Sequence, residues 1–173
     1  MNKKLAYELK SMVREDQKAV ATRQKKGVVD LRLLNIHTKR MREIVHDFGW
    51  PTVSSVGKEG AKNAWLLVQH AYKSLAFQKK CLLLMEKTFK DSPDEVTPMH
   101  IAFLTDRVRV NENKPQKFGT QFYTNGKEDL KLWPIRDKKN VDKRRAAFGI
   151  EPLADYIEAA KSFKPVAIKK TIR

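Results

Sequence analysis

Cysteine is almost absent from this sequence, and that scarcity excludes two kinds of stabilising site. Cys81 is the single cysteine among 173 residues, so neither an internal disulfide nor a cysteine-based zinc site can form. It lies in the apolar run CLLLM, which favours a buried, unreactive thiol. Long apolar runs are also missing, and the N-terminal MNKKLAYELKSMVRED contains no apolar stretch of signal-peptide length. We therefore expect a soluble, cytoplasmic protein with no membrane-spanning segment.

Common signatures of catalysis and cofactor binding are absent as well. The sequence has no phosphate loop, no dinucleotide-binding glycine pattern, no HExxH and no GxSxG. Its 4 histidines, His37, His46, His70 and His100, lie on separate segments, so a metal site would require them to converge in space. The sequence therefore names no cofactor and gives no support for a metal. Whether the protein is an enzyme stays open at this point.

Positive charge is in large excess. The 36 lysines and arginines against 20 acidic residues give a formal net charge of +16. The densest clusters, at residues 23–26 and 138–145, are typical of helix ends and solvated faces. Such a charge attracts nucleic acid or acidic partners without selecting among them. Because no nucleic-acid-binding signature is present, a merely basic surface is the favoured interpretation, and any binding of nucleic acid would be through nonspecific charge.

The spacing of apolar residues predicts a mainly helical protein. Helical periodicity marks one segment that ends near residue 25, followed by segments at 30–48, 58–72, 75–89 and 98–109. Residues 51–57 are expected to form a connector, and Ser74 is expected to cap the fourth helix. Asn125-Gly126 suits a two-residue type I′ turn, which predicts a β-hairpin from its flanking segments. Two short helices should follow, the first capped by Asn140 and the second opened by Pro152.

The predicted organisation is a single compact helical domain over residues 1–160, with one small β-hairpin near residues 118–133. A hydrophobic content of 41% is enough for a core in a chain of this length. Residues 161–173 contain five basic groups and no acidic one, which indicates a basic C-terminal tail. No internal repeat, linker or low-complexity segment indicates a second domain.

Polar residues that interrupt apolar helices are the candidates for a functional site. In the third expected helix, Glu59, Asn63 and His70 share one face, Gln69 lies at its edge, and apolar residues occupy most of the rest. Polar groups on a covered helix need partners or a cavity. An imidazole can act there as an acid, a base or a metal ligand. The alternative is a histidine at the edge of the core that makes one hydrogen bond.

The fifth expected helix carries Asp106 and Arg107 within an otherwise apolar stretch. Arg107 could hold a carboxylate or phosphate, and Asp106 could orient His70 or bind a substrate hydroxyl. The alternatives are an ion pair between Asp106 and Arg109 and a favourable place for Arg107 near the helix C-terminus.

A third candidate segment is Phe118-Gly119-Thr120-Gln121, which precedes the hairpin. Its glycine permits a close backbone approach, although an ordinary turn with surface polar residues explains the same pattern. We expect Gln69, His70, Asp106, Arg107 and Gln121 to converge on one cavity. His70 would be the general acid or base, Asp106 its orienter and Arg107 an anion anchor.

An ordered set of motifs resembles a bacterial family known only as a domain of unknown function, family 6624. The matching residues are Gly49-Trp50-Pro51, Trp65, Gln69-His70, Leu104-Thr105-Asp106-Arg107, Gln116, Phe118-Gly119-Thr120-Gln121 and Val141-Asp142 with Arg144-Arg145. The similarity runs from about Leu9 to Tyr156. Phe118 departs from the family, which usually has tyrosine there, and Ala19-Val20 stands where an arginine usually follows the Asp16-Gln17 pair. The resemblance implies a compact, largely helical domain and brings no established reaction.

The sequence leaves several functions open. The first is a domain that binds a small molecule or modified residue, as a binding module or as an enzyme, and its ligand would be an anionic small molecule or acidic group. Its catalytic residues would be His70 and Asp106. Its substrate-binding residues would be Gln69, Arg107, Gln116, Thr120, Gln121 and Trp50. The second is a basic adaptor that binds nucleic acid or an acidic protein, and the third is a purely structural interaction domain.

Overall fold

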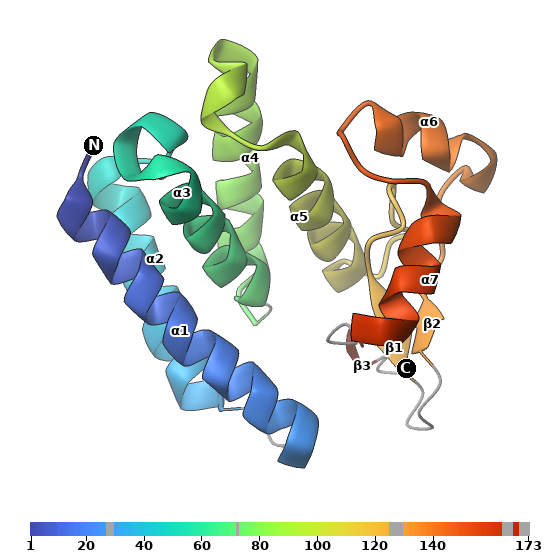
Figure 1. Ribbon diagram of the computed structural model, residues 1–173, viewed down its shortest axis with the longest axis horizontal. Coiled ribbons are helices and arrows are strands. Elements are labelled where there is room, and N and C mark those ends of the chain that lie inside the picture. Colours follow the sequence, from blue (N-terminus) through green and yellow to red (C-terminus); the bar gives the residue numbers. More distant parts are fainter. Residues whose placement is uncertain (27–29, 72, 125–129, 164–167, 170–173) are drawn as a thin grey trace. The chain divides into compact units, whose positions relative to one another are not determined.

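The computed structural model describes residues 1–26, 30–71, 73–124, 130–163 and 168–169 (Figure 1). The chain forms two compact units, Met1–Ile101 and Ala102–Arg173. Within the described residues helices predominate, and the strands of more than one residue form a single small sheet. The predicted mainly α fold is therefore confirmed.

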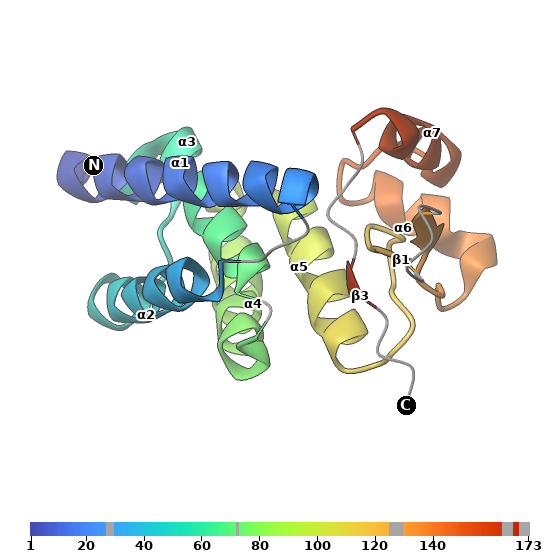
Figure 2. The ribbon, with the colours of Figure 1, turned by 90° about the horizontal axis from the view of Figure 1, so that it is seen from below.

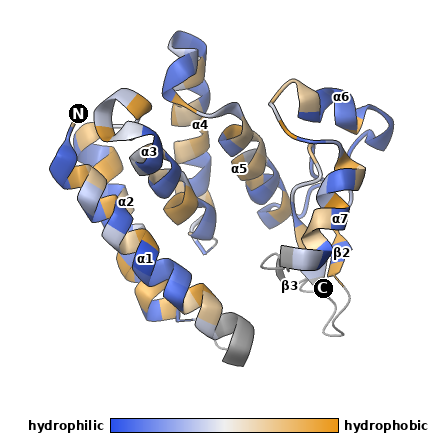
Figure 3. Ribbon diagram, in the orientation of Figure 1, coloured by the Kyte–Doolittle hydropathy of each residue, from blue (hydrophilic) through white to orange (hydrophobic). Residues whose placement is uncertain are grey.

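The described residues of the first unit form helices joined by short connecting segments, with no strand among them. It contains α1 (Lys3–Lys26), α2 (Leu31–Phe48), α3 (Val53–His70), α4 (Leu75–Asp91), the 3-10 helix η1 (Pro93–Glu95) and the start of α5 (Pro98–Asn111). The central helix is α3, which packs against α1, α2 and α4 (Figure 2). Hydrophobic residues recur along these helices with hydrophilic ones between them (Figure 3). The hydrophobic faces supply fully buried core residues, which include Leu9, Met41, Ile44 and Val68.

The start of α3 differs from the expectation of a connector at 51–57. Thr52 and Ser55 form a capping box, and this reciprocal pair of hydrogen bonds starts the helix at Val53. Gly57 then interrupts the helical conformation with φ of +79°. The helix ends at His70, and Tyr72, which was expected to belong to it, lies outside the described residues. Ser74 does precede α4, but its side chain makes no capping hydrogen bond.

The second unit holds the rest of α5, the sheet and the late helices. Its elements are β1 (Phe122–Thr124), β2 (Leu130–Leu132), the 3-10 helix η2 (Lys138–Asn140), α6 (Val141–Ala146), α7 (Leu153–Phe163) and β3 (Ile168–Lys169). Phe122, Tyr156 and Ala160 form a buried cluster that joins β1 to α7. Asn140 precedes α6, but its side chain makes no capping hydrogen bond, and its Nδ2 donates to the carboxylate of Asp137.

The predicted hairpin is present, and the sheet is larger than predicted. β1 pairs antiparallel with β2, with Phe122 opposite Leu132, whereas the expected turn at Asn125-Gly126 lies outside the described residues. β3 pairs in parallel with the other edge of β1. Residues 161–173 therefore contribute a short strand and the end of α7, where the sequence indicated only a basic tail.

Candidate functional site

His70 is held by a carboxylate that the sequence interpretation did not assign to it. Nδ1 of His70 and Oδ2 of Asp16 lie 2.6 Å apart, within hydrogen-bond distance. The Asp16 side chain is 1% exposed, whereas the imidazole of His70 keeps 17% of its surface exposed. The pair thus joins a buried acid on α1 to a partly accessible imidazole at the end of α3.

The amphipathic pattern of α1 places Asp16 at this position. Leu5, Leu9 and Met12 lie on the buried face of α1, and Asp16 continues the same face one turn further along. α1 packs along α3, so a residue on this face is directed toward α3. Gln17 adds a second hydrogen bond to the carboxylate, with Nε2 3.2 Å from Oδ2.

The hydrogen bond fixes which nitrogen of His70 is reactive. An ionised carboxylate can only accept, so Nδ1 of the neutral imidazole carries the proton and donates it to Asp16. The basic lone pair is then on Nε2. Among the described residues, the bond to Asp16 is the only hydrogen bond that the side chain of His70 makes. A carboxylate behind one imidazole nitrogen, with the other nitrogen left for a proton transfer, is the geometry of a general base.

A second histidine contacts the neighbouring residue of α1. Nε2 of His37 on α2 lies 3.2 Å from Oε2 of Glu15. Here the exposure is reversed, because the imidazole is 5% exposed and the carboxylate 56% exposed. With its imidazole covered, His37 joins α2 to α1 and presents no accessible nitrogen for chemistry.

Asp106 is fully occupied within the second unit. Its carboxylate accepts hydrogen bonds from the backbone N–H groups of Lys117, Phe118 and Thr120, and from the Thr120 hydroxyl, at 2.6–3.1 Å. Burial raises the pKa of Asp106 above its usual range, and these hydrogen bonds oppose that shift. The alternative of an ion pair between Asp106 and Arg109 is wrong, since the described residues contain no such pair and Nε of Arg109 donates to the Pro115 carbonyl. Asp106 therefore organises the loop that precedes β1.

Gln116 closes the same loop from its other side. Its Oε1 accepts the N–H of Gln121, while its Nε2 donates to the carbonyls of Gln121 and Trp133. Gln121 in turn donates to Oγ1 of Thr120 at 2.8 Å, and the Tyr156 hydroxyl donates to the Thr120 carbonyl. These polar side chains are buried, so the alternative of an ordinary turn with surface polar residues is wrong.

The basic cluster at 138–145 is only partly a solvated face. Arg145 is 0% exposed, and it donates to the carbonyls of Phe118 and Glu151 at 2.6 Å. Its guanidinium lies 5.0 Å from the centre of the Tyr156 ring. Arg144 donates to the carbonyls of Lys117, Arg136 and Asp137. Both arginines therefore stabilise the loop, which corrects the expectation that they belong to a solvated surface.

The expected site residues fall into two groups. Gln69, His70 and the buried Trp50 belong to the first unit. The structure brings Asp106, Gln116, Thr120 and Gln121 together in the second unit, where Arg107 is also buried. The convergence of both groups on one cavity stays a prediction, but the carboxylate that orients His70 in this structure is Asp16.

Comparison with known proteins identifies the family of the chain. A model of the family of unknown function DUF6624 matches residues 15–169. The chain belongs to this family. No curated protein and no solved structure matches it. The DUF6624 match contains both Asp16 and His70, so the hydrogen-bonded pair lies within the part of the chain that resembles the family.

Asp16 is the residue of the DUF6624 protein that the sequence interpretation missed. Two signals could have found it: its place in the Asp16-Gln17 motif, and its position on the apolar face of α1 after Leu5, Leu9 and Met12. A carboxylate on a buried helix face needs a partner, but the helical period does not say which one.

Two further findings concern metal ligands and membrane spans in this DUF6624 protein. Across the described ranges, no three His, Cys, Asp or Glu side chains are grouped as metal ligands would be. None of the helices in the part of the chain that is described is long and apolar enough to cross a membrane.

Proposed function

We propose that this DUF6624 protein is a small-molecule or modified-residue binding domain, and an enzyme, in which His70 acts as general acid or base. Asp16 is the positioning residue that holds the imidazole. The observation that carries the proposal is the 2.6 Å hydrogen bond between the buried carboxylate of Asp16 and the partly exposed imidazole of His70.

The asymmetry of burial supports a functional reading of this pair. Removing a carboxylate from water costs several kcal/mol, and the hydrogen bonds from His70 and Gln17 offset only part of that cost. A pair retained for stability alone is better served by a buried imidazole with both nitrogens satisfied. In this protein the carboxylate is buried and the imidazole reaches the surface, as proton transfer to a ligand requires.

Asp106 does not take part in this proposal, because the loop at 116–121 uses its carboxylate. An oxygen that accepts N–H groups at hydrogen-bond distance cannot also orient a separate imidazole without losing them. The orienting role that the sequence suggested for Asp106 passes to Asp16.

The test combines binding and turnover on the full chain. Saturation-transfer NMR is carried out with mixtures of nucleotides, sugar phosphates and amino acids, and turnover is measured with p-nitrophenyl acetate and p-nitrophenyl phosphate. We expect at least one probe to give a signal that His70→Gln abolishes. Glu59→Gln on the exposed part of α3 should leave that signal unchanged, because Glu59 forms an exposed ion pair with Lys10.

Two results would overturn the proposal. The first is a signal of equal size in the wild type and in His70→Gln. The second is a His70→Gln variant that no longer folds, seen as a lost thermal transition, because the Asp16–His70 pair would then be a structural element. Absence of any signal from the whole panel also counts against the enzyme.

The basic adaptor is a second candidate, supported by the net charge of +16. Lys138, Lys139 and Lys143 are exposed and free of the internal role that Arg144 and Arg145 have. Binding through these lysines should weaken linearly on a log-log plot as salt rises, and should weaken further when all three become glutamine. Affinity that does not respond to salt would exclude this alternative.

A further inference from the structure

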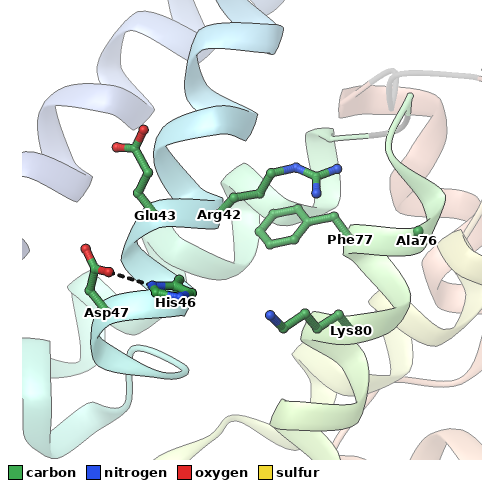
Figure 4. A pocket seen from close by; sticks show the side chains of 7 residues that line it. All are labelled: Arg42, Glu43, His46, Asp47, Ala76, Phe77 and Lys80. Carbon is green, nitrogen blue, oxygen red and sulfur yellow. Dashed lines mark hydrogen bonds and ion pairs between the residues drawn. The ribbon is translucent and has the colours of Figure 1, made fainter.

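A surface cavity lies between α2 and α4 in the first unit. Its volume is about 520 Å³. The lining residues are Arg42, Glu43, His46 and Asp47 from α2, with Ala76, Phe77 and Lys80 from α4 (Figure 4). Pockets for small molecules commonly enclose about 300–1,000 Å³, so the cavity is large enough for one. The Asp16–His70 pair is not part of its lining.

Arg42 is held in place on one side of this cavity. Its guanidinium carbon lies 4.9 Å from the centre of the Phe77 ring, and Nη2 donates a hydrogen bond to Oγ of Ser74. Phe77 is 3% exposed, so it is a fixed surface for the guanidinium. The remaining N–H groups of Arg42 have no hydrogen-bond partner among the described residues. A fixed guanidinium with free donors can bind a carboxylate or phosphate through two parallel hydrogen bonds.

Lys80 supplies a second positive charge from the other helix. It follows Phe77 by one helical turn, and its side chain extends from α4 toward His46 on α2 (Figure 4). Both charges lie close enough to affect the thiol of Cys81. Burial raises the pKa of Cys81 to about 12, and the positive charges of Lys80 and Arg42 oppose this rise. The two cations therefore influence the same region of α4.

The acidic residues of the lining have cationic or histidine partners of their own. Glu43 accepts a hydrogen bond from Nη1 of Arg40, which also binds Glu8, and Asp47 lies 2.8 Å from Nδ1 of His46. By contrast, neither Arg42 nor Lys80 forms an ion pair with any described carboxylate. The cavity thus combines two positive charges that lack a counter-charge with room for a ligand.

We propose that this cavity binds a small anionic molecule, whose phosphate or carboxylate group is held between Arg42 and Lys80. Arg42 supplies a preorganised pair of donors, and Lys80 supplies a mobile charge that adapts to the ligand. The site is separate from His70, so it does not depend on the function proposed above.

The test measures binding of defined anions to the full chain by calorimetry and NMR. The probes are inorganic phosphate, acetate and adenosine 5′-monophosphate, with uncharged adenosine as the reference. We expect saturable binding of adenosine 5′-monophosphate and none of adenosine, and the phosphate and acetate titrations identify the preferred anionic group. Lys80→Gln should weaken binding at least about tenfold, equivalent to about 1.4 kcal/mol.

Lys90→Gln is the matched control, because Lys90 is an exposed lysine in the last turn of the same helix and its loss changes the net charge equally. We expect it to leave the affinity within about twofold. Arg42→Lys keeps the charge but removes the two-donor geometry, so it should also weaken binding, and thermal unfolding checks that it folds. Equal effects of Lys80→Gln and Lys90→Gln would overturn the proposal, as would the absence of saturable binding by all three anions.

Discussion

Asp16 and His70 are 54 residues apart in the sequence, yet their side chains meet in a 2.6 Å hydrogen bond. The bond joins α1 to the last turn of α3, and it leaves Nε2 of the imidazole as the basic nitrogen. The same pair therefore contributes to helix packing and gives the protein an oriented imidazole. Substitutions at its two ends can separate these contributions.

Asp16→Asn should lower the free energy of unfolding by about 1–2 kcal/mol, because a neutral amide oxygen replaces the charged acceptor of a buried hydrogen bond and an N–H₂ group replaces the other carboxylate oxygen. Asp47→Asn is the control, since it alters an aspartate–histidine contact whose two side chains are 52% and 82% exposed. That exposed contact should contribute less than about 1 kcal/mol. Urea denaturation measures the free energy of unfolding of both variants, and long-range ¹H–¹⁵N NMR identifies the tautomer of His70. Equal losses for the two variants would show that the Asp16–His70 pair does not stabilise the fold.

Asp106→Asn should destabilise the second unit by about 3 kcal/mol or more. The asparagine side chain has only one acceptor oxygen. Its N–H₂ group would face backbone N–H donors that the Asp106 carboxylate accepts in the wild type. Asp142→Asn is the comparison, because Asp142 accepts a single N–H, that of Leu153 at 2.7 Å. It should cost about 1 kcal/mol. Denaturant unfolding of the two variants measures the difference, and similar costs would contradict the role of Asp106 in the loop.

Gly119→Ala should be more destabilising than Gly149→Ala. Both glycines have positive φ, +72° and +65°, so alanine introduces comparable backbone strain of about 1 kcal/mol at each position. A Cβ at Gly119 would lie 2.7 Å from Cδ1 of Leu153, whereas a Cβ at Gly149 meets no atom within 4 Å. We expect an additional cost of about 1–2 kcal/mol at Gly119 from this overlap. The difference in thermal midpoint between the two variants tests this additional cost. Equal midpoints would show that Leu153 moves aside freely.

Stability should fall below neutral pH because of His100. Its ring stacks on Trp65, with centroids 4.1 Å apart, and burial lowers the pKa of His100 from 6.5 to about 4. As the pH falls, the unfolded chain therefore binds a proton before the folded protein does. The contribution of the neutral imidazole is complete above pH 6.5 and is lost between pH 6.5 and about 4, up to about 3 kcal/mol.

The comparison variant for this pH effect is His100→Phe, which keeps an aromatic ring against Trp65 but cannot titrate. Urea denaturation at a series of pH values should give a smaller decline for His100→Phe than for the wild type. All other side chains are the same in both proteins, so the difference isolates His100. Parallel declines would show that His100 does not cause the effect.

Local patterns predicted the helices well. Amphipathic spacing placed the end of α1 and the bounds of α2, α4 and α5 within a few residues of those observed. The beginning of α3 was wrong because the capping box of Thr52 and Ser55 was not considered. β3 was missed because two residues that pair with β1 carry no periodic signal of their own.

For the candidate site, the sequence identified His70 but not Asp16, the carboxylate that contacts it in the structure. It also identified the buried group that contains Asp106, Gln116, Thr120 and Gln121, because polar residues within apolar segments are unusual. It could not show that these side chains bind one another and the loop backbone. Likewise, Arg144 and Arg145 have the same composition as a solvated basic cluster, and only their hydrogen bonds distinguish them.

The sequence by itself determined that this protein is basic, mainly helical and provided with a small hairpin, since these properties follow from composition and from periods of two and 3.6 residues. Only the tertiary structure decided that Asp16 binds His70, that Asp106 holds a loop, and that Arg42 and Lys80 face one cavity. The physical reason is that helical periodicity fixes the direction of a side chain relative to its own helix. Which group it meets depends on how helices distant in the sequence pack together.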